Sequence, residues 1–153
     1  MQDWNEDDFD EEEYERERKE EEKRVANLPI VKKAKDLFVT INAFIETFTD
    51  EEDTLDLKSG LFNNVAIINA KIRGAEAGDL YSIRMENAVL IKVNAVDIKT
   101  TAYTLEIMEI GDADYIDIIK NEVDEFRKIF VEWVATFDRN NNMGDEWGIW
   151  TDE

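Results

Sequence analysis

Two pairs of glutamates have the spacing that best suits chemistry in this sequence of 153 residues. Glu106 and Glu109 form one E-x-x-E pair, and Glu122 and Glu125 form a second, with twelve residues between the pairs. Residues three apart share one face of a helix, so two antiparallel helices joined by a tight turn could bring the pairs face to face. Four carboxylates could then hold Mg²⁺, which prefers oxygen ligands.

The spacing of these four glutamates resembles the E-x-x-E…E-x-x-D pattern of all-α nucleoside triphosphate pyrophosphohydrolases, although the last residue here is Glu125 rather than Asp. The resemblance implies Mg²⁺-dependent hydrolysis of a nucleotide. A second interpretation needs no ligand. Because 38 of the 153 residues are acidic, such pairs arise readily by chance, and the flanking apolar residues place them on or beside the solvent face. A solvated charged face is therefore the first interpretation, and a magnesium enzyme is the alternative.

The sequence contains neither cysteine nor histidine, which narrows the possible chemistry. Disulfides, thiolate nucleophiles, Cys/His zinc sites and iron–sulfur ligation are excluded. Ferritin-like di-iron sites need Glu-x-x-His, so their standard form is excluded too. The residue most often used for acid–base catalysis near neutral pH is also absent. We therefore expect no cofactor and favour a protein that is not an enzyme.

The net charge of −20 restricts the partners of the chain. The first 24 residues hold 13 acids and five bases, and the remainder is acidic as well. Acidic surfaces repel nucleic-acid phosphates and anionic lipids, so a protein with a basic surface is a better electrostatic match. The sequence contains no run of about 18 apolar residues, so it predicts no membrane-spanning segment. The acidic N-terminus lacks the features of a signal peptide, and we expect a cytoplasmic protein.

The elements that must position these residues are helical. Apolar residues recur every three or four positions in the segments 28–48, 57–77, 79–110 and 113–137, which contain only one proline, Pro29. We expect Asp79 to cap the third of these helices, Gly111 to end it, and Asp112 or Asp114 to start the last. Four amphipathic helices with short connections predict an all-α fold, an antiparallel four-helix bundle over residues 27–137.

The segment 79–110 carries two apolar stripes. The first comprises Leu80, Ala88, Ile91, Ala95, Ile98, Ala102 and Leu105; the second comprises Val89, Val93, Val96, Tyr103, Ile107 and Ile110. Two stripes on one helix indicate neighbours on both sides, either within the monomer or across a subunit interface. The β-branched run VLIKVNAVDI leaves a strand as the alternative, although the length of the pattern favours a helix.

Residues 1–26 form an acidic arm outside the predicted bundle. Opposite charges lie three or four residues apart from Glu11 to Arg24, including Glu12/Arg16, Glu15/Lys19 and Glu20/Arg24. These pairs favour a solvated helix preceded by a disordered tip, because no apolar stripe would dock it. Its aromatic residues Trp4, Phe9 and Tyr14 either bind a partner or are incidental.

Residues 138–153 form a polar loop and an apolar tail. Trp147, Ile149 and Trp150 are unusually apolar for such a segment, and aromatic residues commonly anchor interfaces. The tail either folds back onto its own bundle or contacts another subunit or a partner.

Three stretches share a layout with a known family: KAKDLFVTINAFIETF, GLFNNVAIINAKIRGAEAG and ENAVLIKVNAVDIKTTAYTLEIMEIGDADYIDIIKNEVDEFRKIF. From Ile30 to Val134 the chain resembles the four-helix-bundle family related to proteins encoded in 23S rRNA intervening sequences, and the acidic start and DEWGIW ending are similar to uncharacterised Bacteroidetes members. The resemblance implies a four-helix bundle that assembles as a ring-like homo-oligomer. Some relatives are basic and linked to nucleic acid, whereas this chain is acidic and lacks their Arg-rich stretch. The family has no catalytic residues to transfer.

These observations predict a non-enzymatic helical-bundle protein that acts through self-association or protein–protein interaction. Its candidate contacts are the second stripe of segment 79–110 and the aromatic residues of the tail.

Overall fold

The computed structural model describes residues 10–151, and within them the secondary structure is five α-helices and no strand. The helices are α1 (Glu11–Ala26), α2 (Pro29–Ile45), α3 (Leu57–Glu76), α4 (Tyr81–Met108) and α5 (Ala113–Val134). The fold is therefore all-helical, as predicted. The strand alternative for VLIKVNAVDI is wrong, because these residues lie inside α4.

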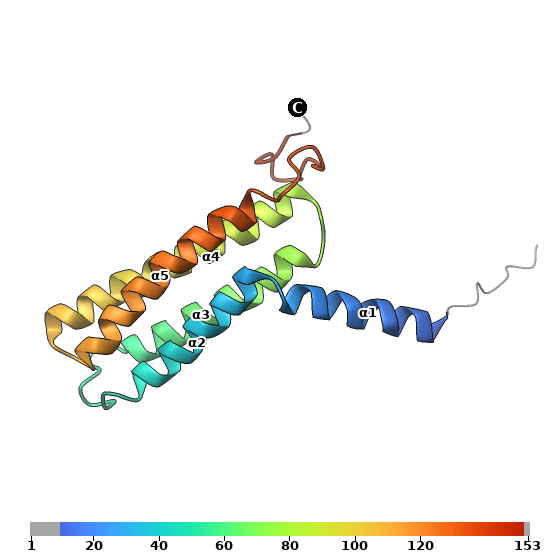
Figure 1. Cartoon of the computed structure of the whole chain (residues 1–153). Helices are drawn as coiled ribbons and strands as arrows, with labels where there is room; N and C mark the ends of the chain where they lie inside the picture. The colour runs from blue at the N-terminus through green and yellow to red at the C-terminus, as the bar shows by residue number, and fades with distance from the viewer. Residues whose placement is uncertain (1–9, 152–153) are drawn as a thin grey trace, which may run out of the picture.

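Four of the helices enclose one apolar core. α2 packs against α3 and α5, and α4 packs against the same two helices, so that each of the four touches two neighbours (Figure 1). Each contributes one stripe of buried residues, among them Phe44, Leu37, Ile68, Ile91, Ile98, Ile119 and Phe126. Large apolar side chains repeated at helical spacing explain this packing. No helix within residues 10–151 combines the length and apolar character needed to cross a bilayer.

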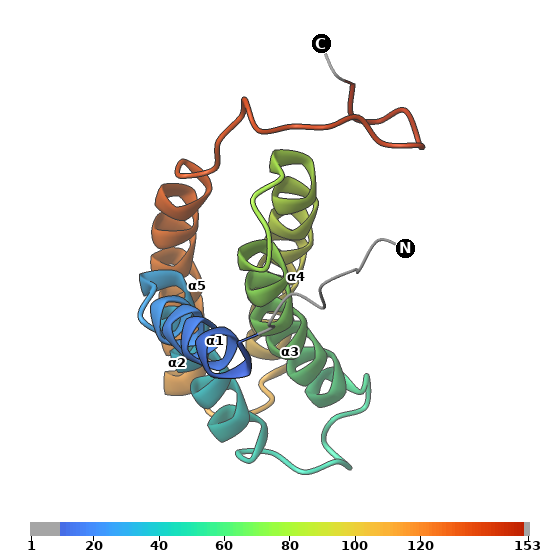
Figure 2. The same ribbon diagram turned by 90° about the vertical axis from the view of Figure 1, so that its right-hand side faces the viewer.

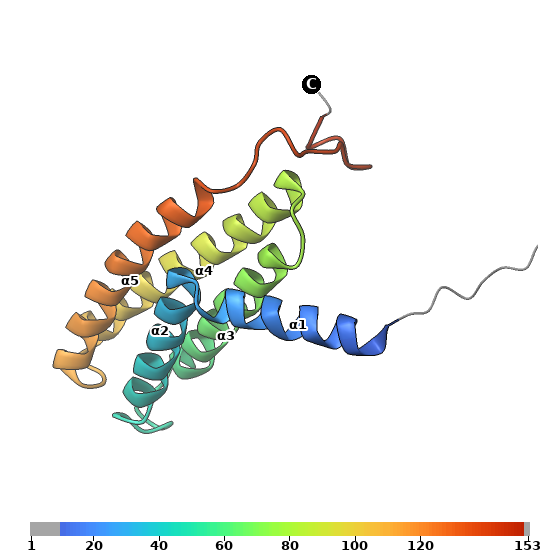
Figure 3. The ribbon, with the colours of Figure 1, turned by 45° about the vertical axis from the view of Figure 1, so that its right-hand side comes forward.

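α1 leaves this group at the start of α2 and points away from it (Figures 1, 2 and 3). Val25 is its only buried residue within the described range. The ion pairs along it join Arg16 to Glu13, Arg18 to Glu22, Lys19 to Glu15 and Arg24 to Glu21. The predicted pair Glu15/Lys19 is present. Arg16 and Arg24 instead pair with the acids three residues before them, whereas the prediction paired them with the acids four residues before. Both spacings bring side chains together on a helix.

The turn between α4 and α5 uses two residues in the left-handed region. α4 ends at Met108, followed by Glu109 with φ of 55° and Gly111 with φ of 80°. Asp112 then caps α5, because its carboxylate accepts hydrogen bonds from the backbone N–H groups of Asp114 at 2.9 Å and Tyr115 at 3.1 Å. The predicted start signal, Asp112, is therefore present, whereas α4 ends earlier than predicted, with Glu109 rather than Gly111 as its C-cap residue.

The start of α4 differs from the prediction. Asp79 does not cap it, because Leu80 occupies the N-cap position and makes no side-chain capping bond. Instead, the N–H of Tyr81 donates to the Asn141 carbonyl at 2.8 Å, and the N–H of Ser82 donates to Asn142 Oδ1 at 3.2 Å. A loop that follows α5 thus satisfies donors that every helix leaves open at its start.

Candidate functional site

α4 has two opposite apolar stripes, and the protein covers only one. The inner stripe runs from Ala88 to Leu105 and is buried in the core. The second predicted stripe faces the other way. Its members Val89, Val93, Val96, Tyr103 and Ile107, here called the outer stripe, are 47–82% exposed. The sixth predicted member, Ile110, is instead half-buried against the core.

The outer stripe departs from the usual pattern of a surface helix. Such a helix carries polar residues on the side away from the core. Both helices that contact α4, namely α3 and α5, pack on its inner side, so no helix in the described residues packs over the outer one. Lys120 of α5 partly covers Tyr103, with 4.3 Å between its Nζ atom and the ring centroid. Thr100 interrupts the row between Val96 and Tyr103. A row of exposed apolar side chains of this length is still typical of an interaction surface.

A groove of about 670 Å³ lies beside the outer stripe, between α4 and α5. Its apolar walls include Val96 and Tyr103 of α4 and Phe130 and Val131 of α5. Its charged lining residues are Lys92, Lys99, Asp124 and Arg127. We call this feature the α4–α5 groove, and its volume falls within the roughly 300–1,000 Å³ of sites that take a bound group.

The charge of the α4–α5 groove is opposite to that of the chain. Three cations and one acid line it, although the whole protein carries a net charge of −20. Lys99 Nζ lies 2.5 Å from Asp124 Oδ1, and this hydrogen bond lowers the pKa of Asp124. Lys92 and Arg127 make no ion pair with any described residue. The groove therefore suits a partner that is apolar and acidic.

The C-terminal tail is anchored to the start of α4. Trp150 Nε1 donates a hydrogen bond to Glu86 Oε1 at 2.9 Å, and the indole meets the Tyr81 ring edge-on with centroids 6.1 Å apart. Asp145 Oδ1 accepts hydrogen bonds from the N–H groups of Ile149 at 3.0 Å and Trp150 at 3.2 Å. Figure 2 shows this segment passing the start of α4 and continuing beyond it.

Trp147 and Ile149 project from the anchored turn into solvent. Their exposed fractions are 87% and 75%. Trp150, at the end of the turn and against α4, is half-buried. Gly148 between them has a φ of 72°, which favours glycine and sharpens the turn. We call residues 145–150 the tail turn. It presents two large apolar side chains on a hydrogen-bonded support.

The aromatic residues of the acidic arm are only partly placed. Trp4 and Phe9 lie outside the described residues. Tyr14 lies in α1 and is 53% exposed. In the described residues, the arm therefore contributes one aromatic side chain, Tyr14, which lies on α1 and not on α4.

Three of the four glutamates of the E-x-x-E pairs take separate partners. Glu106 pairs with Lys120 at 2.5 Å, Glu125 pairs with Lys33 at 2.6 Å, and Glu122 accepts a hydrogen bond from Thr40 at 2.9 Å. Glu109 is the exposed left-handed residue after α4. Hydrogen bonding to the partners raises the pKa of Lys120 and lowers that of Glu125.

These partners explain why the glutamates form no common site. Glu122 and Glu125 lie on α5 and contact residues of α2, whereas Glu106 lies on α4 and contacts Lys120 of α5. No group of three or more acidic side chains in residues 10–151 is arranged to hold a metal ion. The geometry offers no observation in favour of the nucleotide-hydrolase alternative.

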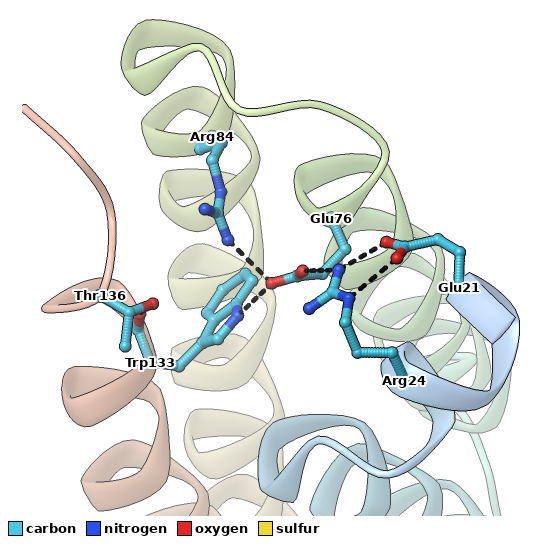
Figure 4. Close-up of polar contacts among 6 residues, drawn as sticks. All are labelled: Glu21, Arg24, Glu76, Arg84, Trp133 and Thr136. Carbon is cyan, nitrogen blue, oxygen red and sulfur yellow. Dashed lines mark hydrogen bonds and ion pairs between the residues drawn. The ribbon is translucent and has the colours of Figure 1, made fainter. Parts of the chain in front are cut away.

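Glu76 at the end of α3 is a buried carboxylate that the sequence interpretation missed. Its side chain is only 7% exposed. Glu76 Oε1 accepts hydrogen bonds from Arg84 Nη2 at 2.8 Å and Trp133 Nε1 at 2.7 Å, and Oε2 accepts one from Arg24 Nη2 at 2.9 Å (Figure 4). Arg24 also pairs with Glu21 at 2.6 Å, and the two acids, Glu21 first, raise the pKa of Arg24.

The Glu76 network connects four helices, because its donors come from α1, α4 and α5. A cavity of about 540 Å³ adjoins it. The Arg84 guanidinium also stacks on Phe137, with 4.0 Å between its Cζ atom and the ring centroid. Both carboxylate oxygens are occupied by donors of the protein, so the network fits a structural connection better than a binding site.

No protein-family model, no curated protein and no solved structure matches this chain.

Proposed function

We propose that this protein is a non-enzymatic helical bundle that acts by self-association, with the outer stripe and the α4–α5 groove as its contact surface. The observation that carries the proposal is the outer stripe, five large apolar side chains that remain exposed on the side of α4 opposite the core. Apolar area removed from water is the main driving force of protein association.

The proposal also includes a cytoplasmic location, an antiparallel order of α2–α5 and kinship with the intervening-sequence family. Pairwise packing of each helix with two neighbours supports the antiparallel order, as does the short turn between α4 and α5. The proposed kinship rests on the layout of the sequence.

The outer stripe alone supports only weak association. Full burial of one large apolar side chain contributes about 1.5–3 kcal/mol, so five half-exposed ones contribute about 5 kcal/mol per copy. Lost translational and rotational freedom opposes association by roughly 4–15 kcal/mol. Two copies would contribute about 10 kcal/mol, and the smallest of these costs leaves about 6 kcal/mol, a dissociation constant of some tens of micromolar at best. A stable assembly therefore requires a further anchor.

Light scattering and sedimentation equilibrium of the full chain over a wide concentration range test this proposal. We expect the average mass to exceed that of the monomer as concentration rises. Val93→Glu combined with Val96→Glu places two charges in the contact and is expected to return the protein to monomer.

Val39→Glu is the matched control, because Val39 is 60% exposed but lies on α2. It should leave the mass unchanged. A wild-type chain that stays monomeric at millimolar concentration would refute the proposal, as would equal dissociation by the α2 and α4 variants.

A further inference from the structure

We propose that the tail turn of a second copy occupies the α4–α5 groove, with Trp147 and Ile149 inserted between α4 and α5. This inference rests on the proposed function, since it names the partner of the same surface. It supplies the anchor that the outer stripe lacks.

The exposure of Trp147 is the first argument. Tryptophan is the side chain most enriched at energetic centres of interfaces, and here it is 87% exposed. The same exposure shows that Trp147 does not occupy the groove of its own chain. Ile149, at 75% exposed, accompanies it.

The tail turn is held in place before it binds. Asp145 fixes the turn through two backbone hydrogen bonds, and Trp150 attaches it to Glu86. A rigid support lowers the conformational entropy lost on binding, which is how pre-organised segments gain affinity. The turn is therefore better suited to insertion than a flexible tail would be.

Charge complementarity is the second argument. Residues 145–153 contain four acids and no base, whereas the groove is lined by Lys92, Lys99 and Arg127 against a single acid. Lys92 and Arg127 make no ion pair with described residues, so they are available to Glu146 or to the indole face of Trp147. Tyr103 and Phe130 provide the aromatic wall for the indole.

The contact is head-to-tail, because each copy offers one tail turn and one groove at different places on its surface. Such a contact does not stop at two copies by itself. A contact of one outer stripe with another would be two-fold symmetric and would stop at a dimer. The two arrangements therefore predict different results when variants are mixed.

Sedimentation of two full-length variants tests the inference. Trp147→Ala removes the inserted side chain but keeps the groove, and Lys92→Glu with Arg127→Glu reverses the groove but keeps the tail turn. Each alone is expected to weaken self-association by at least about 30-fold, the effect of losing one dominant interface residue. Mixed one-to-one, they are expected to form a heterodimer, since one intact groove meets one intact tail turn.

Trp4→Ala with Phe9→Ala is the control for the other aromatic segment and should associate like the wild type. The inference is overturned if Trp147→Ala associates normally, if mixing restores nothing, or if the Trp4 and Phe9 variant is the one that dissociates. If the Val93 and Val96 variant dissociates while the Trp147 variant and the groove variant associate normally, the proposed function is retained and insertion of the tail turn is rejected. Circular dichroism melting of each variant checks that it is folded.

Discussion

The side chain of Glu76 is a buried carboxylate at the end of α3, where the ends of α1 and α5 and the start of α4 meet. The charge is neutralised by Arg84 and Arg24, and the indole N–H of Trp133 supplies a third hydrogen bond. A buried charge is tolerated only when it is paired and hydrogen-bonded, and removing one partner leaves the others uncompensated. Glu76 therefore joins α3 to three other helices through directional hydrogen bonds.

We expect Glu76→Ala to lower the free energy of unfolding by about 2–4 kcal/mol, because it strands a largely buried Arg84. The measurement is urea unfolding followed by circular dichroism. Glu132→Ala is the matched control, since Glu132 lines the same cavity but is exposed, and its change should stay below about 0.5 kcal/mol. Equal effects of the two substitutions would contradict a structural role for the network.

Glu76 could have been found in the sequence. It follows Ile72 by four residues and so continues the core stripe of α3. The sequence interpretation weighed the glutamates of the E-x-x-E pairs and did not consider this position. The donors were harder to predict, because Arg24, Arg84 and Trp133 come from three other helices and meet only through tertiary packing.

The ion pair in the α4–α5 groove gives a pH prediction. The hydrogen bond from Lys99 lowers the pKa of Asp124 below its ordinary value of 3.8. A folded-state pKa below the unfolded one means that the pair stabilises the fold above about pH 4, and that this contribution is lost as the pH falls through the lowered value. NMR titration of the Asp124 carboxyl should show a midpoint that rises toward 3.8 in Lys99→Met.

Lys92→Met is the control for this titration, since Lys92 lines the same groove without pairing to Asp124. Its midpoint should stay close to that of the wild type. An unchanged midpoint in Lys99→Met would mean that the ion pair does not persist in solution.

At the scale of elements, α4 shows how far periodicity can be used. The spacing of apolar residues predicted its existence and both of its stripes, because a helix places every third or fourth residue on one side. Periodicity could not tell which stripe faces the core, since both are apolar and of similar length. The cap was predicted at Asp79 from its residue type. The true partners, Asn141 and Asn142, could not be predicted because they lie about 60 positions away.

The turn between α4 and α5 depends on Gly111. A Cβ atom there would lie 2.8 Å from two ring carbons of Phe44, in addition to the positive φ. We expect Gly111→Ala to destabilise the protein by about 2–4 kcal/mol, from backbone strain and overpacking together. The melting temperature measures this effect.

Gly60→Ala is expected to have the opposite sign. Gly60 lies within α3, and a Cβ atom there would meet nothing within 4 Å. Helix propensity then predicts a gain of about 0.5–1 kcal/mol. A loss of stability at Gly60 would show that the surroundings of α3 are tighter than the structure indicates.

At the scale of the molecule, α1 is attached through few residues. It packs only slightly on α2, and its main connections are Val25 in the core and the Arg24–Glu76 ion pair. The charged surface of the rest of α1 contributes little to the stability of the bundle, since exposed ion pairs are worth only a few tenths of a kcal/mol.

Two truncations separate these contributions. Removing residues 1–20 keeps Arg24 and Val25 and should leave the melting temperature within about 2 °C. Removing residues 1–26 takes both away, and the loss of about 1–2 kcal/mol should lower it by about 4–8 °C. A large decrease after the shorter truncation would show that the acidic segment itself stabilises the bundle.

The contact between the end of the chain and the beginning of α4 also has a consequence for biosynthesis. The N–H groups of Tyr81 and Ser82 find their acceptors in Asn141 and Asn142. During translation the longest helix is therefore made well before the residues that complete its first turn. Until about 60 residues beyond the start of α4 have left the ribosome, these two N–H groups can hydrogen-bond only to water, and the first turn of α4 can fray.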